Sequence, residues 1–130
     1  MLNTNKSNSE EDDKYMLQEQ KAAAFFAPAK YNIEKFQKGD FIFLYRSGEG
    51  VVAVGTASGV VEKRSYQNDD NHPEEEYCQL LSEFKQIRTP IRASRIKAIT
   101  GMNHVFHSVM FPLDDVAGRK LYTFITGGLR

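Results

Sequence analysis

Positive charge is concentrated in one stretch of this sequence, between positions 85 and 97, where no acidic residue interrupts the basic ones. This basic segment consists of Lys85, Arg88, Arg92, Arg95 and Lys97. Lysine and arginine side chains bind phosphate groups, so the basic segment could contact the backbone of a nucleic acid. The alternative is a solvated surface, which is the more common role of such a run of charge.

Acidic residues elsewhere in the chain balance the basic segment. The acidic loop, from Asp69 to Glu76, contains five acidic residues, and the whole sequence has 17 basic and 17 acidic residues with a net charge of +0. A neutral protein lacks the positive field that drives strong non-specific binding to nucleic acid. A neutral total is still compatible with a local phosphate-binding face.

Patterns typical of catalytic or metal sites are weak in this chain. Cys78 is the only cysteine, which excludes an internal disulfide and fits a reducing compartment such as the cytoplasm. His104 and His107 have a spacing seen in metal sites, but on a strand they would point to opposite faces. We therefore expect no metal, no cofactor and a non-catalytic role. We also expect no membrane partner, since no apolar run approaches a membrane span and the polar N-terminus carries no signal-peptide pattern.

Length and composition predict one globular domain over residues 1–130, with 41% hydrophobic and 26% charged residues. The first helix is expected to begin at Ser9, whose hydroxyl can cap it, to run through Ala22–Ala24 and to end before Pro28. A short strand at 2–4 precedes this helix. Further helical segments are expected at 31–36, 93–99 and 112–125.

Two apolar strands are expected at 41–45 and 51–55, joined by a glycine-rich turn. Their near-continuous apolar character predicts burial on both faces. The stretch 77–87 is ambiguous, because its apolar residues have helical spacing and its alternation is weak, so that propensity alone favours a helix. Thr89-Pro90 is expected to end this element, and 105–111 is expected to form another strand.

The stretch that begins at Lys38 reads Lys-Gly-Asp, Phe-Ile-Phe-Leu-Tyr, Arg-Ser-Gly-Glu-Gly and Val-Val-Ala-Val-Gly. It resembles the central hairpin of the EVE domain family, which belongs to the PUA-like superfamily and is related to the YTH and ASCH domains. Other landmarks occur in the family's order, namely the polar segment from Lys6 to Asp12, Phe25-Phe26-Ala27-Pro28, Pro90-Ile91 and Phe111-Pro112. The resemblance spans nearly the whole chain.

The resemblance implies an α+β fold, specifically a PUA-like, small, mostly antiparallel β-barrel with peripheral helices. It also favours a strand for 77–87. Domains of this superfamily commonly hold a nucleotide base in an aromatic-lined pocket. The resemblance therefore implies a non-catalytic module that recognises a base of DNA or RNA, with or without a modification on that base.

Carried over onto this sequence, the base pocket would be formed by Ser7, Asn8, Asp12, Phe25, Phe26, Tyr45, Ser47 and Tyr66. Stacking of a base on an aromatic ring contributes about 1–3 kcal/mol, and Asn, Ser and backbone groups can match the polar edge of a base. Since the chain has no Trp, the walls of the pocket would be Phe or Tyr. The basic segment would meet the phosphates.

Structural roles compete with these assignments. One of Phe25 and Phe26 is expected in the core, and Tyr45 ends a strand that is expected to be buried. Ser47 belongs first to the hairpin connection, and Tyr66 could be a surface ring in polar surroundings.

Two other functions stay open at this level. A protein-interaction or regulatory module with a vestigial pocket is favoured by the absence of Trp. An ASCH-like enzyme that processes a nucleotide or small amide would need converging polar residues, for which Lys6, Asp12 and Glu49 are the candidates.

Overall fold

In the computed structural model, the described residues are 1–4, 10–46, 48–101, 113 and 115–126. The strands are β1 (Leu2–Asn3), β2 (Lys21–Phe25), β3 (Phe41–Arg46), β4 (Gly50–Ala57), β5 (Glu62–Arg64) and β6 (Glu76–Ile91). The helices are α1 (Glu10–Glu19), α2 (Ala93–Thr100) and α3 (Asp115–Thr126), with the 3₁₀ helices η1 (Ala29–Lys35) and η2 (Tyr66–Asn68).

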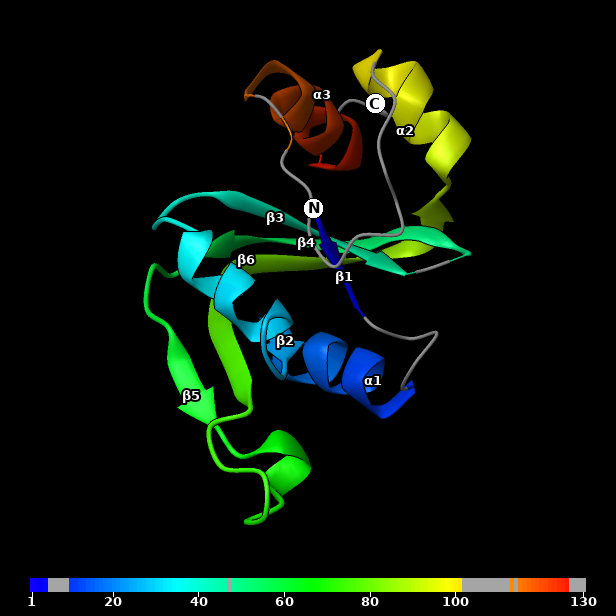
Figure 1. The fold of residues 1–130 in the computed structure, drawn as a ribbon. Helices are drawn as coiled ribbons and strands as arrows, with labels where there is room; N and C mark the ends of the chain where they lie inside the picture. Colours follow the sequence, from blue (N-terminus) through cyan, green and yellow to red (C-terminus); the bar gives the residue numbers. More distant parts are fainter. Residues whose placement is uncertain (5–9, 47, 102–112, 114, 127–130) are drawn as a thin grey trace.

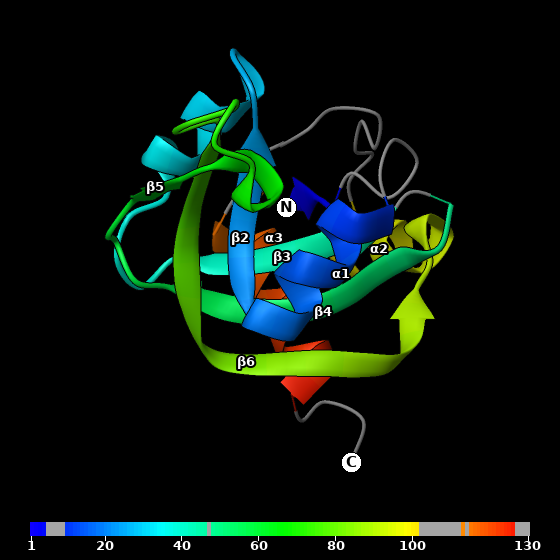
Figure 2. The same cartoon turned by 90° about the horizontal axis from the view of Figure 1, so that it is seen from below.

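In this part of the chain, six strands form one sheet in the order β1-β3-β4-β6-β2, with β5 also on β6. β1 runs parallel to β3, and the other pairs are antiparallel. β6 has 16 residues and turns a corner, so that its first part pairs with β2 and β5 and its later part with β4 (Figures 1 and 2). The predicted α+β class is thereby confirmed, and the curled, mostly antiparallel sheet is compatible with a small barrel-like fold.

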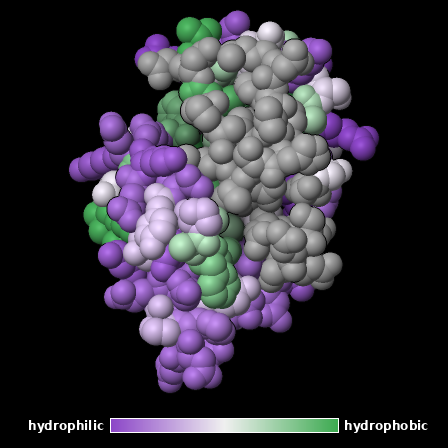
Figure 3. All heavy atoms as spheres, viewed as in Figure 1, coloured by the Kyte–Doolittle hydropathy of each residue, from purple (hydrophilic) through white to green (hydrophobic). Residues whose placement is uncertain are grey.

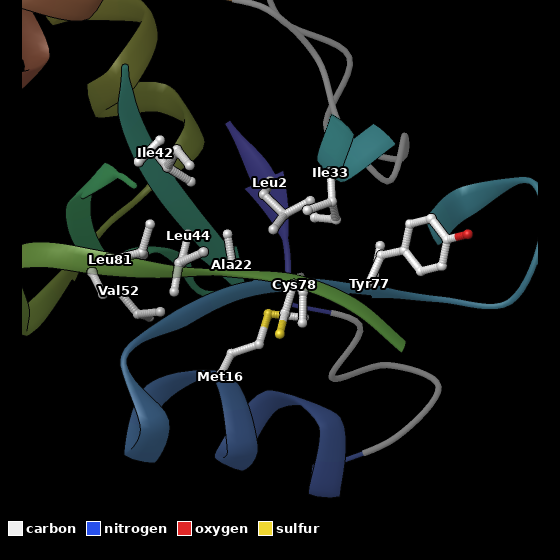
Figure 4. Close-up of a cluster of buried hydrophobic side chains, with 14 residues drawn as sticks. Leu2, Met16, Ala22, Ile33, Ile42, Leu44, Val52, Tyr77, Cys78 and Leu81 are labelled. Atoms are coloured by element: carbon white, nitrogen blue, oxygen red, sulfur yellow. The ribbon is translucent and has the colours of Figure 1, made fainter. Parts of the chain in front are cut away.

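Alternation along β3 divides the core into two parts, because successive side chains of a strand point to opposite faces. Ile42 and Leu44 belong to a first core with Leu2, Met16, Ala22, Ala23, Ala24, Ile33, Val52, Ala53, Ala57, Tyr77, Cys78 and Leu81. Phe43 and Tyr45 belong to a second core with Met1, Val51, Val54, Ile91, Ile96 and Leu121. Figure 1 shows α1 and β2 on one side of the β3–β4–β6 layer and α2 and α3 on the other, and Figure 4 shows the first core.

The predicted extension of the first helix through Ala22–Ala24 is wrong. α1 ends at Glu19, Gln20 has a left-handed φ of 55°, and the chain continues as β2 along β6. Each of the three alanines is at most 3% exposed, and both α1 and η1 contact β2. The high helix propensity of alanine is outweighed because small side chains allow β2 to pack closely against β6 and both helices.

The ambiguous stretch 77–87 is a strand within β6, where Cys78 lies opposite Ala23 and Lys85 lies opposite Val54. The predicted break at Thr89-Pro90 is wrong, because β6 continues to Ile91. The register between β4 and β6 shifts in the stretch that contains Pro90. The missing N–H of proline is tolerated there, since the ladder of hydrogen bonds is already irregular.

The other expected elements agree with the structure, with small differences in their bounds. The N-terminal strand, the 3₁₀ turn, both hairpin strands and the two later helices are all present. The predicted strand 105–111 lies outside the described residues. None of the helices in the described part of the chain has the length and apolar character that a bilayer crossing requires.

Candidate functional site

Four of the residues predicted to line a base pocket come together near the Glu76 end of β6: Asp12, Phe25, Phe26 and Tyr66. Phe25 ends β2 opposite Glu76, and Phe26 follows it. The centre of the Tyr66 ring lies 5.3 Å from that of Phe25 and 4.8 Å from that of Phe26, both edge to face. The Tyr66 hydroxyl donates a hydrogen bond to Asp12 of α1, 54 positions away in the chain, at 3.2 Å. Three distant segments therefore meet at one site.

A tight loop holds Tyr66 in this place. The Tyr66 N–H donates to the His72 carbonyl at 3.0 Å, and the His72 N–H donates to the Asp69 carbonyl at 3.0 Å. The loop brings the His72 ring to 5.6 Å from that of Phe26 and 6.4 Å from that of Tyr66. Phe25, Phe26, Tyr66 and His72 are called the aromatic cluster below.

The two phenylalanines of the cluster have different surroundings. Phe25 is half-buried and packs against the first core, whereas Phe26 is 36% exposed. Phe26 also has a left-handed φ of 61°, and its N–H donates to the Glu75 carbonyl at 2.8 Å. A left-handed conformation costs a non-glycine residue about 1–3 kcal/mol and tends to occur at functional sites. Phe26 is thus the member of the pair that can meet a ligand.

A polar network joins the aromatic cluster to α1. Asp12 is 1% exposed, and its carboxylate accepts hydrogen bonds from the Tyr66 hydroxyl and from the Gln67 side-chain amide at 3.3 Å. The Gln67 amide also donates to the Tyr66 hydroxyl at 3.1 Å. The sequence gives little signal for Gln67 or His72, because both enter the site only through the folding of a polar loop.

The remaining predicted pocket residues are not in the aromatic cluster as far as the structure describes them. Tyr45 is only 6% exposed and lies in the second core, where burial raises the pKa of its hydroxyl. Ser7, Asn8 and Ser47 lie outside the described residues.

The basic segment is exposed, and it lies toward the other end of β6 from the aromatic cluster. Lys85 and Arg88 are on the later part of β6, Arg92 directly precedes α2, and Arg95 and Lys97 are on α2. The guanidinium carbon of Arg95 lies 5.1 Å from the centre of the Phe124 ring of α3. The structure therefore does not bring the basic segment and the aromatic cluster together.

A hollow of about 590 Å³ lies beside the basic segment, lined by Ile99, Val116, Arg119, Lys120, Thr123 and Phe124. Two of its lining residues, Arg119 and Lys120, are cationic, and Phe124, which also lines it, contacts Arg95. Val116, Arg119, Lys120 and Thr123 have the spacing of one helix face, and this periodicity is a signal from which sequence reasoning could have found them.

The candidate residues for an enzyme do not converge among the described residues. Asp12 faces Tyr66 and Gln67, whereas Glu49 pairs with Arg46 at 3.4 Å. Arg46 in turn binds the Asp13 carboxylate with two nitrogens, at 3.1 and 2.8 Å. Lys6 lies outside the described part. No group of three or more His, Cys, Asp or Glu side chains in the described part could hold a metal ion.

Cys78 is expected to be unreactive in the folded protein. Burial in the first core, with the Glu76 carboxylate nearby, raises the pKa of its thiol to about 12, so the thiol stays protonated at neutral pH (Figure 4). We expect iodoacetamide at pH 8 to alkylate Cys78 at least about 100-fold more slowly in buffer than in urea. Mass spectrometry of timed samples measures both rates, and rapid labelling of the folded protein would contradict this assignment.

The face of the molecule in Figure 3 is mostly hydrophilic where the structure describes it. Apolar groups appear on this face as small, separate areas. Large apolar interfaces are built from contiguous patches of several hundred Å². The described part of this face therefore shows no contiguous apolar patch of that kind.

Comparisons of this chain with protein-family models, with curated proteins and with solved structures found no match. The EVE-type resemblance therefore stays a prediction from the sequence landmarks.

Proposed function

We propose that this protein binds a base of DNA or RNA at the aromatic cluster, without catalysing a reaction on it. The observation that carries this proposal is the meeting of Asp12, Phe25, Phe26 and Tyr66 at one place, with Phe26 partly exposed. We further propose that the fold is PUA-like and of the EVE type, with which the curled sheet and its helices are compatible.

The chemistry of the cluster suits a flat ligand with a polar edge. The rings of Phe25, Phe26 and Tyr66 contact one another edge to face, so a base would stack on the exposed part of Phe26. Such stacking contributes about 1–3 kcal/mol for each base. Gln67 and His72 add hydrogen-bonding groups beside the rings, and a methyl or similar group on the base would add about 0.8 kcal/mol if buried. The proposal covers bases that carry a modification and bases that do not.

Phosphate contacts are proposed for the basic segment rather than for the surroundings of the cluster. Glu74 follows His72 closely and would repel a phosphate, and the charge of Glu75 is already paired with Lys30, whereas Lys85 to Lys97 would attract one. A bound strand would then extend from the cluster along β6 toward α2. A reducing compartment suits the single, buried cysteine, and we propose the cytoplasm as the location of the protein.

The test compares Phe26→Ala with a matched variant, Phe41→Ala. Phe41 is 40% exposed and stacks on Tyr122 of α3 at 4.0 Å, so it is a similarly exposed phenylalanine with an aromatic neighbour outside the cluster. We expect Phe26→Ala to weaken binding of short single-stranded DNA or RNA about tenfold or more, because a stacking surface is lost. Phe41→Ala should bind as the wild type does.

Fluorescence anisotropy with labelled oligonucleotides measures the affinities, and thermal unfolding verifies that both variants are folded. When the titrations are repeated at several salt concentrations, the slope of the logarithm of the binding constant against the logarithm of the salt concentration gives the number of phosphate contacts. Equal affinity of Phe26→Ala and wild type, or equal loss in both variants, would refute the base site.

One observation favours a second function. The rings of the cluster already contact one another, as expected for a vestigial pocket in a protein-interaction or regulatory module. On this alternative, oligonucleotides bind weakly and Phe26→Ala changes neither their affinity nor the salt slope.

A further inference from the structure

The side-chain amide of Gln67 has one orientation that its partners allow. Its nitrogen donates to the Asp12 carboxylate at 3.3 Å and to the Tyr66 hydroxyl at 3.1 Å. A carboxylate only accepts hydrogen bonds, so the amide must present its NH₂ group, and not its oxygen, to Asp12. The Tyr66 hydroxyl donates its own proton to Asp12 and therefore accepts from Gln67. The chemistry of the network thus assigns the amide nitrogen and oxygen of Gln67.

This orientation leaves the oxygen of Gln67 as the open group. Both N–H bonds of the amide are used, and in the described part of the chain Oε1 accepts no hydrogen bond. The side chain is only partly buried, so a ligand can reach it. Gln67 is also held at a left-handed φ of 49°, a strained conformation within the same turn as Tyr66. A fixed acceptor beside an aromatic surface can accept a hydrogen bond from a donor on a flat ligand and so select ligands that carry such a donor.

We propose that Gln67 Oε1 selects bases that carry an exocyclic amino group. This proposal rests on the proposed function, because it assumes that a base stacks on the cluster. An amino group, as in adenine or cytosine, projects a donor beyond the ring. The ring N–H of uracil lies between two carbonyl oxygens, and the Gln67 amide has no free N–H to offer them. Asp12 and Tyr66 act as positioning residues, because they hold the amide in the accepting orientation.

The experiment uses nucleosides in matched pairs, so that base selection is separated from phosphate binding. Adenosine is compared with purine riboside, which lacks only the amino group, and cytidine is compared with uridine. A net hydrogen bond makes adenosine bind about three- to tenfold more tightly than purine riboside, and cytidine bind more tightly than uridine. NMR titration or calorimetry with the full chain measures these affinities.

Two variants locate the selecting group. Gln67→Met keeps the length of the side chain and removes the oxygen, and its adenosine to purine riboside ratio should fall to about one. Gln86→Met makes the same change at an exposed position on the later part of β6 and should keep the wild-type ratio. Thermal unfolding of each variant is measured in parallel, and the wild-type ratios test the proposal even where Gln67→Met fails to fold.

The outcomes distinguish selection by Gln67 from the proposed binding of a base at the aromatic cluster. Equal binding of the paired nucleosides by the wild type, or an unchanged ratio in Gln67→Met, overturns selection by Gln67 and leaves base binding at the cluster intact. The absence of binding for every nucleoside and oligonucleotide overturns both.

Discussion

Gly50→Ala is expected to destabilise the protein by at least about 3 kcal/mol, because it forces two backbone segments apart. Gly50 begins β4 at a φ of 123°, a backbone conformation that residues other than glycine rarely adopt. A Cβ at this position would lie 2.1 Å from the carbonyl oxygen of Ile91 and 2.9 Å from the nitrogen of Arg92. These atoms belong to the point where β6 leads into α2, so the clash cannot be relieved by rotating a side chain.

Gly48→Ala in the same hairpin provides the control. Gly48 also has a positive φ, of 80°, but a Cβ there would meet no atom within 4 Å. We expect this variant to lose only about 1 kcal/mol, from the conformational term alone. Urea unfolding followed by circular dichroism compares the two. Similar losses would show that the close approach of Gly50 to Ile91 does not limit stability.

Lys21→Met is the second change with a large expected effect, about 3–5 kcal/mol of stability. Lys21 Nζ lies 2.6 Å from Glu76 Oε2, and the two residues are only 2% and 6% exposed. A second carboxylate, that of Glu19, lies 3.4 Å from the same nitrogen and is more exposed. Removal of the lysine leaves the Glu76 charge buried without its main partner, and the cost of that desolvation is what the measurement detects.

Two further variants distinguish burial from pairing. Lys30→Met breaks another ion pair of the same length, 2.6 Å to Glu75, but this pair is more exposed, so we expect a much smaller loss. The double variant Lys21→Met/Glu76→Leu removes both buried charges and should be more stable than Lys21→Met alone. Thermal and urea unfolding measure all three, and a double variant no more stable than the single one would contradict this explanation.

Local pattern predicts the hairpin and the later helices well. β3 is apolar without interruption from Phe41 to Tyr45, and Ile42, Phe43, Leu44 and Tyr45 are all buried, on two faces. The same reasoning fails for Ala22–Ala24, where helix propensity predicts a helix and the structure has a strand. It also fails at Pro90, because tolerance of a proline depends on the register of a neighbouring strand.

The candidate site was predicted in part. The family resemblance named Asp12, Phe25, Phe26 and Tyr66, which the structure brings together, and it also named Tyr45, which lies in the second core. Successive side chains of β3 point to opposite faces of the sheet, so Tyr45 lies on the other face from Leu44. Only the packing of the layers decides that the face with Tyr45 belongs to the second core and not to the aromatic cluster.

The sequence by itself determined the apolar hairpin, the helical segments after β6 and the separation of acidic from basic stretches, because these are properties of neighbouring residues. The tertiary structure alone decided that three alanines form a strand, that a long β6 separates the basic segment from the aromatic cluster, and that Gln67 presents its oxygen. These features arise from contacts between residues far apart in the chain, such as Gln67 and Asp12, 55 positions away. Strand pairing and hydrogen-bond partners over such distances depend on the whole fold, and no local spacing encodes them.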